Sequence, residues 1–146
     1  MSQSYTLRPA TADDYDFLFA LHRASMRAYI DTIWGWHEDW QQEYFRQKFD
    51  PARRQIIEID GQNAGVLVVE RRADSLYLEL IELLPAFQGR GVGTAILRQL
   101  IDRARAEGVP LTLHVLRSND AARRLYERLG LRVVAEESDR SRMATV

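Results

Sequence analysis

The chain begins with a short alternating segment and then changes to apolar residues spaced as on a helix. Residues 5–8 predict a short first strand. Apolar residues then recur at intervals of three and four over residues 12–29, which predicts an amphipathic helix with Thr11 and Asp13 at its start. Trp36, Trp40 and Tyr44 continue this spacing, so a second helix is expected to run to about residue 48.

From residue 55 the spacing becomes that of β-strands. Residues 55–59 and 64–70 flank Asp60 and Gly61, a pair typical of a tight hairpin turn. A longer, more apolar run at 75–84 predicts a central strand. The remaining pattern predicts a helix over 92–106, a strand over 111–116, a helix over 121–129, a strand over 131–135 and an edge strand over 143–146. This order indicates an α/β fold with a mixed, mostly antiparallel sheet of six to seven strands and helices on both faces.

Composition narrows the function classes. With 146 residues, 46% of them hydrophobic, the chain suits one domain over 1–146 and is neither disordered nor membrane-spanning. The absence of cysteine excludes disulfides, zinc–thiolate sites and a thiol nucleophile. The first residues lack the pattern of a secretory leader, so a cytoplasmic location is expected. A net charge of −1 argues against a nucleic-acid or membrane partner, although 19 of the 20 basic residues are arginine, with Lys48 the exception.

A glycine-rich turn lies between the central strand and the following helix. Gly89, Gly91 and Gly93 fall within five residues, a composition that costs chain entropy. A helix N-terminus offers unpaired N–H groups, and glycine lets a phosphate approach them closely. The spacing differs from that of the P-loop and of the dinucleotide fingerprint. Phosphate binding is favoured over a tight turn with no ligand because Arg90 and the helix start coincide here.

Two segments resemble the GCN5-related N-acetyltransferases. The run from Leu83 through Pro85 and Gln88-Gly89-Arg90-Gly91-Val92-Gly93 is similar to that family's acetyl-CoA signature, Q/R-x-x-G-x-G/A. The run from Asn119 through Ala122, Leu125-Tyr126 and Gly130-Leu131 resembles its N-x-x-A-x-x-L-Y-x-x-x-G-F segment, with Leu131 where phenylalanine is usual. The resemblance implies a GNAT fold, acetyl-CoA as cosubstrate and direct acetyl transfer to a primary amine of a small molecule, peptide or protein. It also implies a homodimer as one form of assembly.

The resemblance also implies roles for individual residues. The backbone N–H of Leu83 would bind the thioester carbonyl and stabilise the oxyanion. Tyr126 would protonate the leaving thiolate, although it could serve only as a packed aromatic. Asn119 would contact the cofactor, with helix capping as the alternative. The full set of residues expected to bind acetyl-CoA is Leu83, Leu84, Gln88, Gly89, Arg90, Gly91, Val92, Gly93, Thr94, Asn119 and Tyr126.

The acceptor ammonium must lose a proton before attack, since an aliphatic amine has a pKa of about 10.4. Strand parity places Glu79 on the same face as Leu83, so Glu79 is the first candidate base. The side chain of Glu82 points the opposite way, and Glu82 is the second candidate base. A salt bridge to an arginine is the alternative role for an acid on a central strand.

The acceptor pocket is expected in the first half of the chain. Trp34, Trp36, Glu38 and Tyr29 are the candidate substrate residues, because two tryptophans around a glycine can form the walls of a pocket and Glu38 could meet an ammonium. A tryptophan cluster packed between helices and sheet explains the pattern equally well. The three histidines lack ligand spacing, so no metal site is expected.

The sequence therefore predicts an acetyl-CoA-dependent N-acetyltransferase of a single domain. A non-catalytic acetyl-CoA sensor or docking domain is the alternative, in which Glu79 and Tyr126 would have no chemical role. A third hypothesis is a protein that binds nucleic acid through its arginines. A steep salt dependence of binding would support it.

Overall fold

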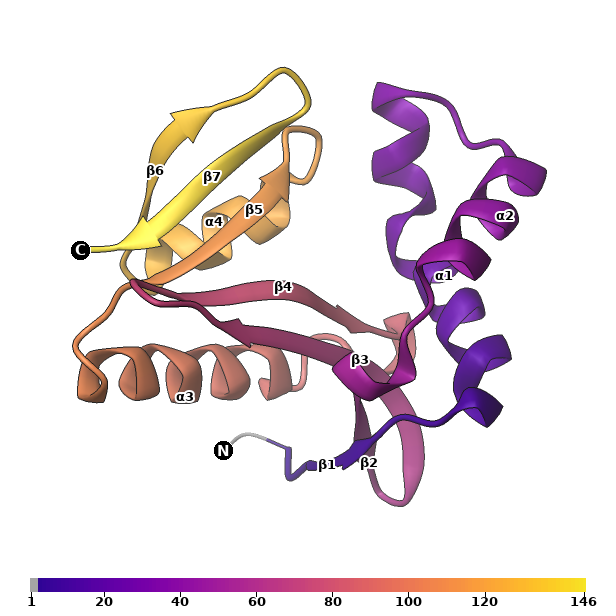
Figure 1. The fold of residues 1–146 in the computed structure, drawn as a ribbon, viewed down its shortest axis with the longest axis horizontal. Coiled ribbons are helices and arrows are strands. Elements are labelled where there is room, and N and C mark those ends of the chain that lie inside the picture. Colours follow the sequence, from indigo (N-terminus) through magenta and orange to yellow (C-terminus); the bar gives the residue numbers. More distant parts are fainter. Residues whose placement is uncertain (1–2) are drawn as a thin grey trace. The chain divides into compact units, whose positions relative to one another are not determined.

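The computed structural model describes residues 3–146 (Figure 1). Seven strands, four α-helices and three short 3-10 turns follow one another in these residues. The helices are α1 (Tyr15–Ile33), α2 (Glu38–Lys48), α3 (Val92–Ala106) and α4 (Asp120–Arg128). The strands are β1 (Thr6–Pro9), β2 (Gln55–Ile59), β3 (Gln62–Arg71), β4 (Leu76–Leu83), β5 (Leu111–Leu116), β6 (Leu131–Glu136) and β7 (Arg140–Thr145).

The strands form one mixed sheet in the order β1-β2-β3-β4-β5-β7-β6. β1 with β2, β2 with β3, β5 with β7 and β6 with β7 are antiparallel, whereas β4 and β5 are parallel. The parallel register joins Leu76–Leu78 to residues 111–113, and β4 continues beyond it to Leu83. The expected mixed, mostly antiparallel sheet is thus confirmed, with seven strands in the described residues.

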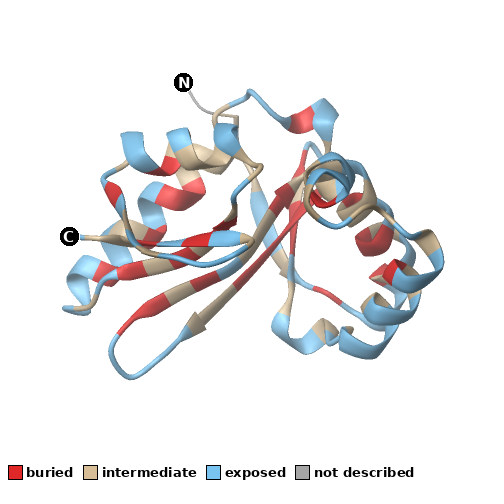
Figure 2. Ribbon diagram, turned by 90° about the horizontal axis from the view of Figure 1, so that it is seen from above, coloured by how far each residue is buried: buried red, intermediate tan, exposed pale blue. Residues whose placement is uncertain are grey.

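The described residues divide into two compact units. The first comprises residues 3–68 with Leu80–Val92, and the second comprises Val69–Glu79 with Gly93–Val146. Strands β3 and β4 contribute residues to both. Each unit has buried apolar residues, which appear in red along strands and helices in Figure 2.

The core of the first unit is built from one face of α1 and the strands of the β2–β3 hairpin. Leu18 and Leu21, spaced one helical turn apart, are 2% and 0% exposed. They cluster with Ile56 on β2 and Val66 on β3. The hairpin turn at Asp60–Gly61 has positive φ at both residues, 53° and 74°, as the sequence predicts for this turn type.

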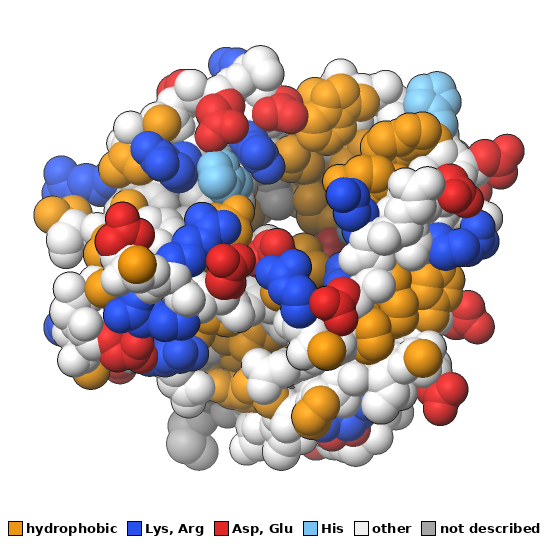
Figure 3. Space-filling model, viewed as in Figure 1, with side chains coloured by type: hydrophobic (Ala, Val, Ile, Leu, Met, Phe, Trp, Pro, Cys, Tyr) orange, Lys and Arg blue, Asp and Glu red, His pale blue; other side chains and the backbone are white. Residues whose placement is uncertain are grey.

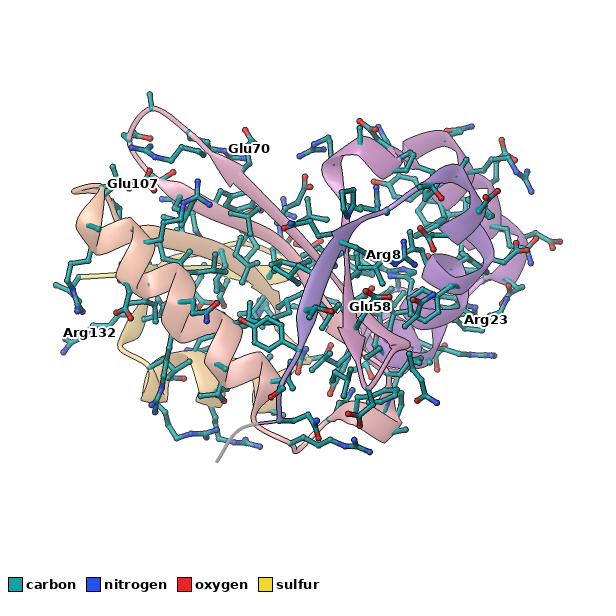
Figure 4. All side chains as sticks on the ribbon, turned by 90° about the horizontal axis from the view of Figure 1, so that it is seen from below. Arg8, Arg23, Glu58, Glu70, Glu107 and Arg132 are labelled. Carbon is teal, nitrogen blue, oxygen red and sulfur yellow. The ribbon has the colours of Figure 1, made fainter. Side chains whose placement is uncertain are left out.

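Charged residues join β1 to its surroundings in the same unit. Arg8 Nη2 and Nη1 donate to the two carboxylate oxygens of Asp14, at 2.8 and 3.0 Å. Arg8 Nε donates to Glu58 on the neighbouring strand β2 at 3.3 Å (Figure 4). Asp14 Oδ2 also accepts from the backbone N–H of Thr11, which completes a capping box at the start of the 3-10 turn Ala12–Asp14 that precedes α1.

The second unit has strand β5 at its centre. Leu111, Leu113 and Val115 alternate inward along β5 and are at most 5% exposed. Met143 on β7 lies opposite Leu113 in the register and is fully buried. The helix α3 buries Ile96 and Leu97 among its apolar residues, as its spacing predicts.

Three details differ from the expectations. The first helix extends to Ile33 instead of residue 29. Trp36 lies before α2 instead of on its face, because Gly35 adopts φ 80° and ends the helical path. The last strand is not an edge strand: β7 lies between β5 and β6, and β6 forms the edge. The reason is that residues 131–145 form a hairpin whose second strand, β7, bonds to both neighbours.

No helix of the described residues is both long and apolar enough to cross a membrane. Within the same residues, no group of three or more histidines, aspartates or glutamates could hold a metal ion.

Candidate functional site

The glycine-rich turn of the first unit leads from β4 into α3. Gly89 and Gly91 adopt φ values of 76° and 83°, a left-handed conformation that residues with a Cβ rarely take. Gln88 Nε2 donates to the carbonyl of Leu83 at 2.9 Å and so connects the turn to the end of β4. The guanidinium of Arg90 lies 5.0 Å from the centre of the Phe87 ring. The positive φ values explain why glycine is required at residues 89 and 91.

The same turn fits a diphosphate. Helix α3 begins at Val92 and runs for 15 residues, so its first N–H groups and its dipole favour an anion at this end. A cation, Arg90, lies in the turn itself. No side chain stands at residues 89, 91 and 93 to cover the backbone.

The end of β4 lies very close to β3. A Cβ added at Gly65 would stand 2.2 Å from the carbonyl oxygen of Glu82, so only glycine allows this approach. The N–H of Leu84 donates to the carbonyl of Ala64 at 2.8 Å. The backbone around Leu83, the predicted oxyanion donor, is therefore held by β3 on one side and by Gln88 on the other.

The two acidic residues of β4 have different surroundings. Glu79 is exposed, whereas Glu82 is 5% exposed. Glu82 Oε2 lies 3.2 Å from Nδ1 of His22 on α1. The sequence predicts that they point in opposite directions, but it does not identify His22 as the partner of Glu82. The sequence offers a salt bridge to an arginine as the alternative role of an acid on this strand, whereas the partner of Glu82 is a histidine.

A pocket of about 670 Å³ opens beside His22 within the first unit. Tryptophan, tyrosine and phenylalanine supply four of its twelve lining residues, and Leu80 of β4 also contributes to the wall. Of the predicted acceptor residues, Trp34 lies in this wall. The lining residues are His22, Ile30, Trp34, Gly35, His37, Trp40, Gln41, Tyr44, Phe45, Lys48, Arg54 and Leu80.

Trp36 and Glu38 form a separate polar cluster with Arg23. Arg23 donates to both Glu38 carboxylate oxygens, at 3.1 and 2.7 Å, and Trp36 Nε1 donates to one of them at 3.1 Å. Gln42 Nε2 donates at 2.9 Å. These hydrogen bonds, Arg23 first, lower the pKa of Glu38 to about 2. Tyr29, the fourth predicted acceptor residue, is half-buried on α1.

In the second unit, α4 carries the residues of the second sequence motif. Asn119 precedes the helix, and its Oδ1 accepts from the N–H of Ala122 at 3.2 Å, which is the capping role. Tyr126 is 9% exposed. Burial raises the pKa of its phenol to about 12, so the hydroxyl keeps its proton at neutral pH.

A hydrogen-bonded chain of three side chains in the second unit was not anticipated from the sequence. Tyr77 Oη lies 2.8 Å from His114 Nδ1, and His114 Nε2 lies 3.1 Å from Glu137 Oε2. All three line a cavity of about 330 Å³. Since Tyr77 pairs with Thr112, His114 lies two residues further along the same face of β5. That relation depends on the β4–β5 register, which the sequence does not contain.

Known proteins resemble this chain along most of its length. Residues 16–131 match the sequence profile of the acetyltransferase (GNAT) family. An uncharacterised N-acetyltransferase of Methanocaldococcus jannaschii is 29% identical over 88% of this chain, and the match spans 61% of that protein. A ribosomal protein bS18-alanine N-acetyltransferase of Salmonella typhimurium is 40% identical over 49% of each chain. The chain thus spans less than two thirds of these curated relatives.

Solved structures share the fold. PaiA N-acetyltransferase of Thermoplasma acidophilum, solved in complex with coenzyme A, superposes with a TM-score of 0.78 at 17% identity and covers 98% of this chain and 99% of its own. The ribosomal-protein-S18-alanine N-acetyltransferase of Escherichia coli gives 0.66 at 22% identity, covering 97% and 93%. At such identities the likeness concerns the fold. The match of the family profile to 16–131 establishes that this chain belongs to the acetyltransferase (GNAT) family.

Proposed function

We propose that this protein transfers the acetyl group of acetyl-CoA directly to a primary amine. The observation that carries the proposal is the turn at Gly89–Gly91, whose left-handed glycines and arginine precede the start of α3. Membership of the acetyltransferase family supports it as well. A non-catalytic acetyl-CoA sensor is not favoured, because the relatives are named as N-acetyltransferases.

In this proposal the diphosphate of acetyl-CoA binds the turn. Gln88 through Thr94 supply backbone N–H groups, Arg90 supplies positive charge, and Gly93 keeps the first helical turn accessible. Leu83 and Leu84 hold the pantetheine and thioester at the end of β4. Asn119 and Tyr126 complete the proposed binding residues. The cap that Asn119 Oδ1 forms with Ala122 leaves the side-chain NH₂ group as the donor available to the cofactor.

The chemical step is a displacement at the thioester carbonyl. The neutral amine nitrogen attacks that carbon, and a C–N bond forms as electron density moves to the oxygen. The backbone N–H of Leu83 donates to this oxyanion. When the tetrahedral intermediate collapses, the C–S bond breaks and the thiolate of CoA leaves. Tyr126 gives that sulfur a proton, which a phenol with a pKa of about 12 still carries at neutral pH.

The proton of the amine needs an acceptor. Glu79 is the proposed base, because it lies on β4 four residues before Leu83 and its side chain is exposed to solvent, through which a water could relay the proton. Glu82, the second candidate base from the sequence, is buried against His22, and His114 is a further candidate. Its contacts with Tyr77 and Glu137 orient the ring.

The acceptor in this proposal is the amine of a peptide or protein, or of a small molecule with similar chemistry. The names of the relatives that acetylate an alanine of a ribosomal protein support a peptide amine. Substrate contact by Trp34 is part of the proposal, and Tyr29, Trp36 and Glu38 would then shape the surroundings. A single domain over 1–146, a cytoplasmic location and a homodimer also belong to it. Size-exclusion chromatography with light scattering tests whether the protein is a homodimer.

The first experiment measures the melting temperature with acetyl-CoA, with CoA and with adenosine. At 100 times its Kd, acetyl-CoA should add about 2.7 kcal/mol, which is several degrees for a domain of this size. Thiol release in the presence of a panel of amines then tests the transfer. A shift with acetyl-CoA but no thiol release with any amine would support the sensor. The absence of a shift at millimolar acetyl-CoA would overturn both.

A further inference from the structure

We infer that the pocket between α1 and α2 binds a bulky, uncharged apolar group attached to the acceptor amine, and that it disfavours polyamines. The inference rests on the proposed transfer reaction and names its substrate class. It is carried by the size of the pocket, the exposure of its aromatic side chains and the distribution of charge around it.

The pocket has the dimensions and surface of a small-molecule site. Its volume of about 670 Å³ falls within the usual range of ligand cavities, roughly 300–1,000 Å³. Trp34 and Trp40 line it and yet are 53% and 60% exposed. Trp40 stacks on Tyr44 with ring centres 4.9 Å apart and an angle of 10° between the planes. An apolar ligand would remove this aromatic surface from water.

Hydrophobic side chains gather over the α1–α2 part of the surface in Figure 3. The alternative explanation, tryptophans packed into the core, does not fit Trp34 and Trp40, since more than half of each side chain meets solvent. Large apolar side chains grouped in this way are typical of a binding site. We therefore assign the apolar part of the acceptor to them.

The charges in the pocket wall are positive. Lys48 Nζ lies 6.0 Å from the centre of the Tyr44 ring, and the Arg54 guanidinium lies 5.7 Å from that of Phe45. The residues that line the pocket include neither aspartate nor glutamate. The rings of Tyr44 and Phe45 thus already have cations beside them, and an incoming cation would meet like charge.

The carboxylates of Glu82 and Glu38 already have protein partners. Glu82 contacts His22, and Glu38 accepts hydrogen bonds from Arg23. A polyamine needs several carboxylates to offset its charges, whereas a monoamine with an apolar body needs none for that body. The positive charge of the pocket wall should therefore favour a monoamine with an apolar body over a polyamine.

Residues on the inner wall of the pocket indicate where the amine of a bound acceptor would lie. Gln41 is 7% exposed and, like His22, lines the pocket. Glu82 holds His22 through Nδ1, which fixes the orientation of the ring. Leu80 belongs to the same wall and lies on β4, three residues before Leu83. An apolar group bound here would therefore place its amine close to the strand that carries the proposed oxyanion donor.

The test compares kcat/KM for amines that differ only in their attached group. Phenethylamine and tryptamine should exceed ethylamine by ~10-fold or more, as expected for burial of an apolar group, and putrescine and spermidine should fall below ethylamine. Tripeptides that begin with Phe or with Gly distinguish a peptide acceptor from a small molecule. Equal kcat/KM for all these amines, or a preference for spermidine, would overturn the inference.

Variants locate the effect in the pocket. Trp34→Ala and Trp40→Ala should raise KM for phenethylamine by ~10-fold and raise that for ethylamine by much less, because ethylamine has no bulky group to bury. Leu7→Ala is the control, because it shortens an exposed apolar side chain on β1. Lys48→Glu should raise kcat/KM for spermidine. Unchanged values in the tryptophan variants would place the apolar group elsewhere.

A binding assay separates this inference from the proposed reaction. Phenethylamine should quench tryptophan fluorescence in the wild-type protein without acetyl-CoA, and less so in Trp34→Ala. Quenching without acetyl transfer to any amine would overturn the reaction and keep the pocket. Transfer without quenching or discrimination would overturn the pocket and keep the reaction.

Discussion

His22 on α1 and Glu82 on β4 lie 60 positions apart in the sequence, and their side chains meet with Nδ1 3.2 Å from Oε2. The Glu82 side chain is 3% exposed and that of His22 is 23% exposed. The pair joins the helix that forms one wall of the aromatic pocket to the strand that leads to the glycine turn. A buried carboxylate in such a place needs its partner, since an unpaired one is costly.

The His22–Glu82 pair should show energetic coupling. His22→Ala leaves the Glu82 carboxylate buried without this partner, so it should lower the free energy of unfolding by about 1–3 kcal/mol. Glu82→Gln keeps the shape and a hydrogen-bonding group, and should cost less. Urea unfolding of both single variants and of the double variant measures the coupling. Strictly additive effects would show that the contact contributes nothing.

Gly65 should not tolerate a side chain. Gly65→Ala would place a Cβ 2.2 Å from the carbonyl oxygen of Glu82, a backbone atom that cannot move without shifting β4. We expect a loss of about 1–3 kcal/mol or more. Gly108→Ala is the matched control, since its added Cβ meets nothing within 4 Å and only the φ of 72° is unfavourable. Equal losses in the two variants would contradict the close approach.

Stability should fall at acid pH because of Asp14. The hydrogen bond from Arg8, which is the largest influence, lowers the pKa of Asp14 below its usual value. A carboxyl whose pKa is depressed by folding stabilises the protein at pH values above its unfolded pKa. This contribution is lost as pH falls through the folded pKa, below about pH 4. Urea midpoints at pH 7 and pH 3 should differ less in Asp14→Asn than in wild type.

Tyr126→Phe tests the proposed general acid. Loss of the phenol should reduce kcat by ~100-fold or more, with little change in melting temperature because the ring remains. Since burial raises the pKa of Tyr126 to about 12, the wild-type rate should not fall between pH 7 and pH 10 through its ionisation. A variant with the wild-type kcat would remove Tyr126 from the mechanism.

Arg90 should act on the cofactor alone. Arg90→Ala removes the cation of the glycine turn, so KM for acetyl-CoA should rise ~5-fold to 20-fold while kcat is retained. Arg105→Ala is the control, because that exposed side chain lies near the opposite end of α3. If both variants have the same KM for acetyl-CoA, the diphosphate is not at the turn.

The local elements follow closely from the sequence. Strand β5 spans residues 111–116 as expected, and the Asp60–Gly61 turn has the conformation typical of that pair. Asn119 caps α4 as its position predicts. These features depend on periodicity, side-chain capping and the freedom of glycine, all of which act over a few residues.

The glycine turn and the family motif were also readable in the sequence, since Gln88 through Gly93 are contiguous. The roles of Glu79, Leu83 and Tyr126 remain predictions. They concern proton transfer and oxyanion binding, which depend on contacts with substrate and cofactor that a sequence motif does not specify.

Only the tertiary structure decided which residues meet across the fold. The pairing of His22 with Glu82, the chain from Tyr77 through His114 to Glu137, and the place of β7 between β5 and β6 all depend on strand order and register. The aromatic residues show the same division. The sequence predicts a pocket around Trp34 and Trp36. In the structure Trp34 and Trp40 line the pocket, whereas the Trp36 side chain donates a hydrogen bond to Glu38. Local spacing sets which side of a helix a residue occupies, and packing of distant segments sets what that side touches.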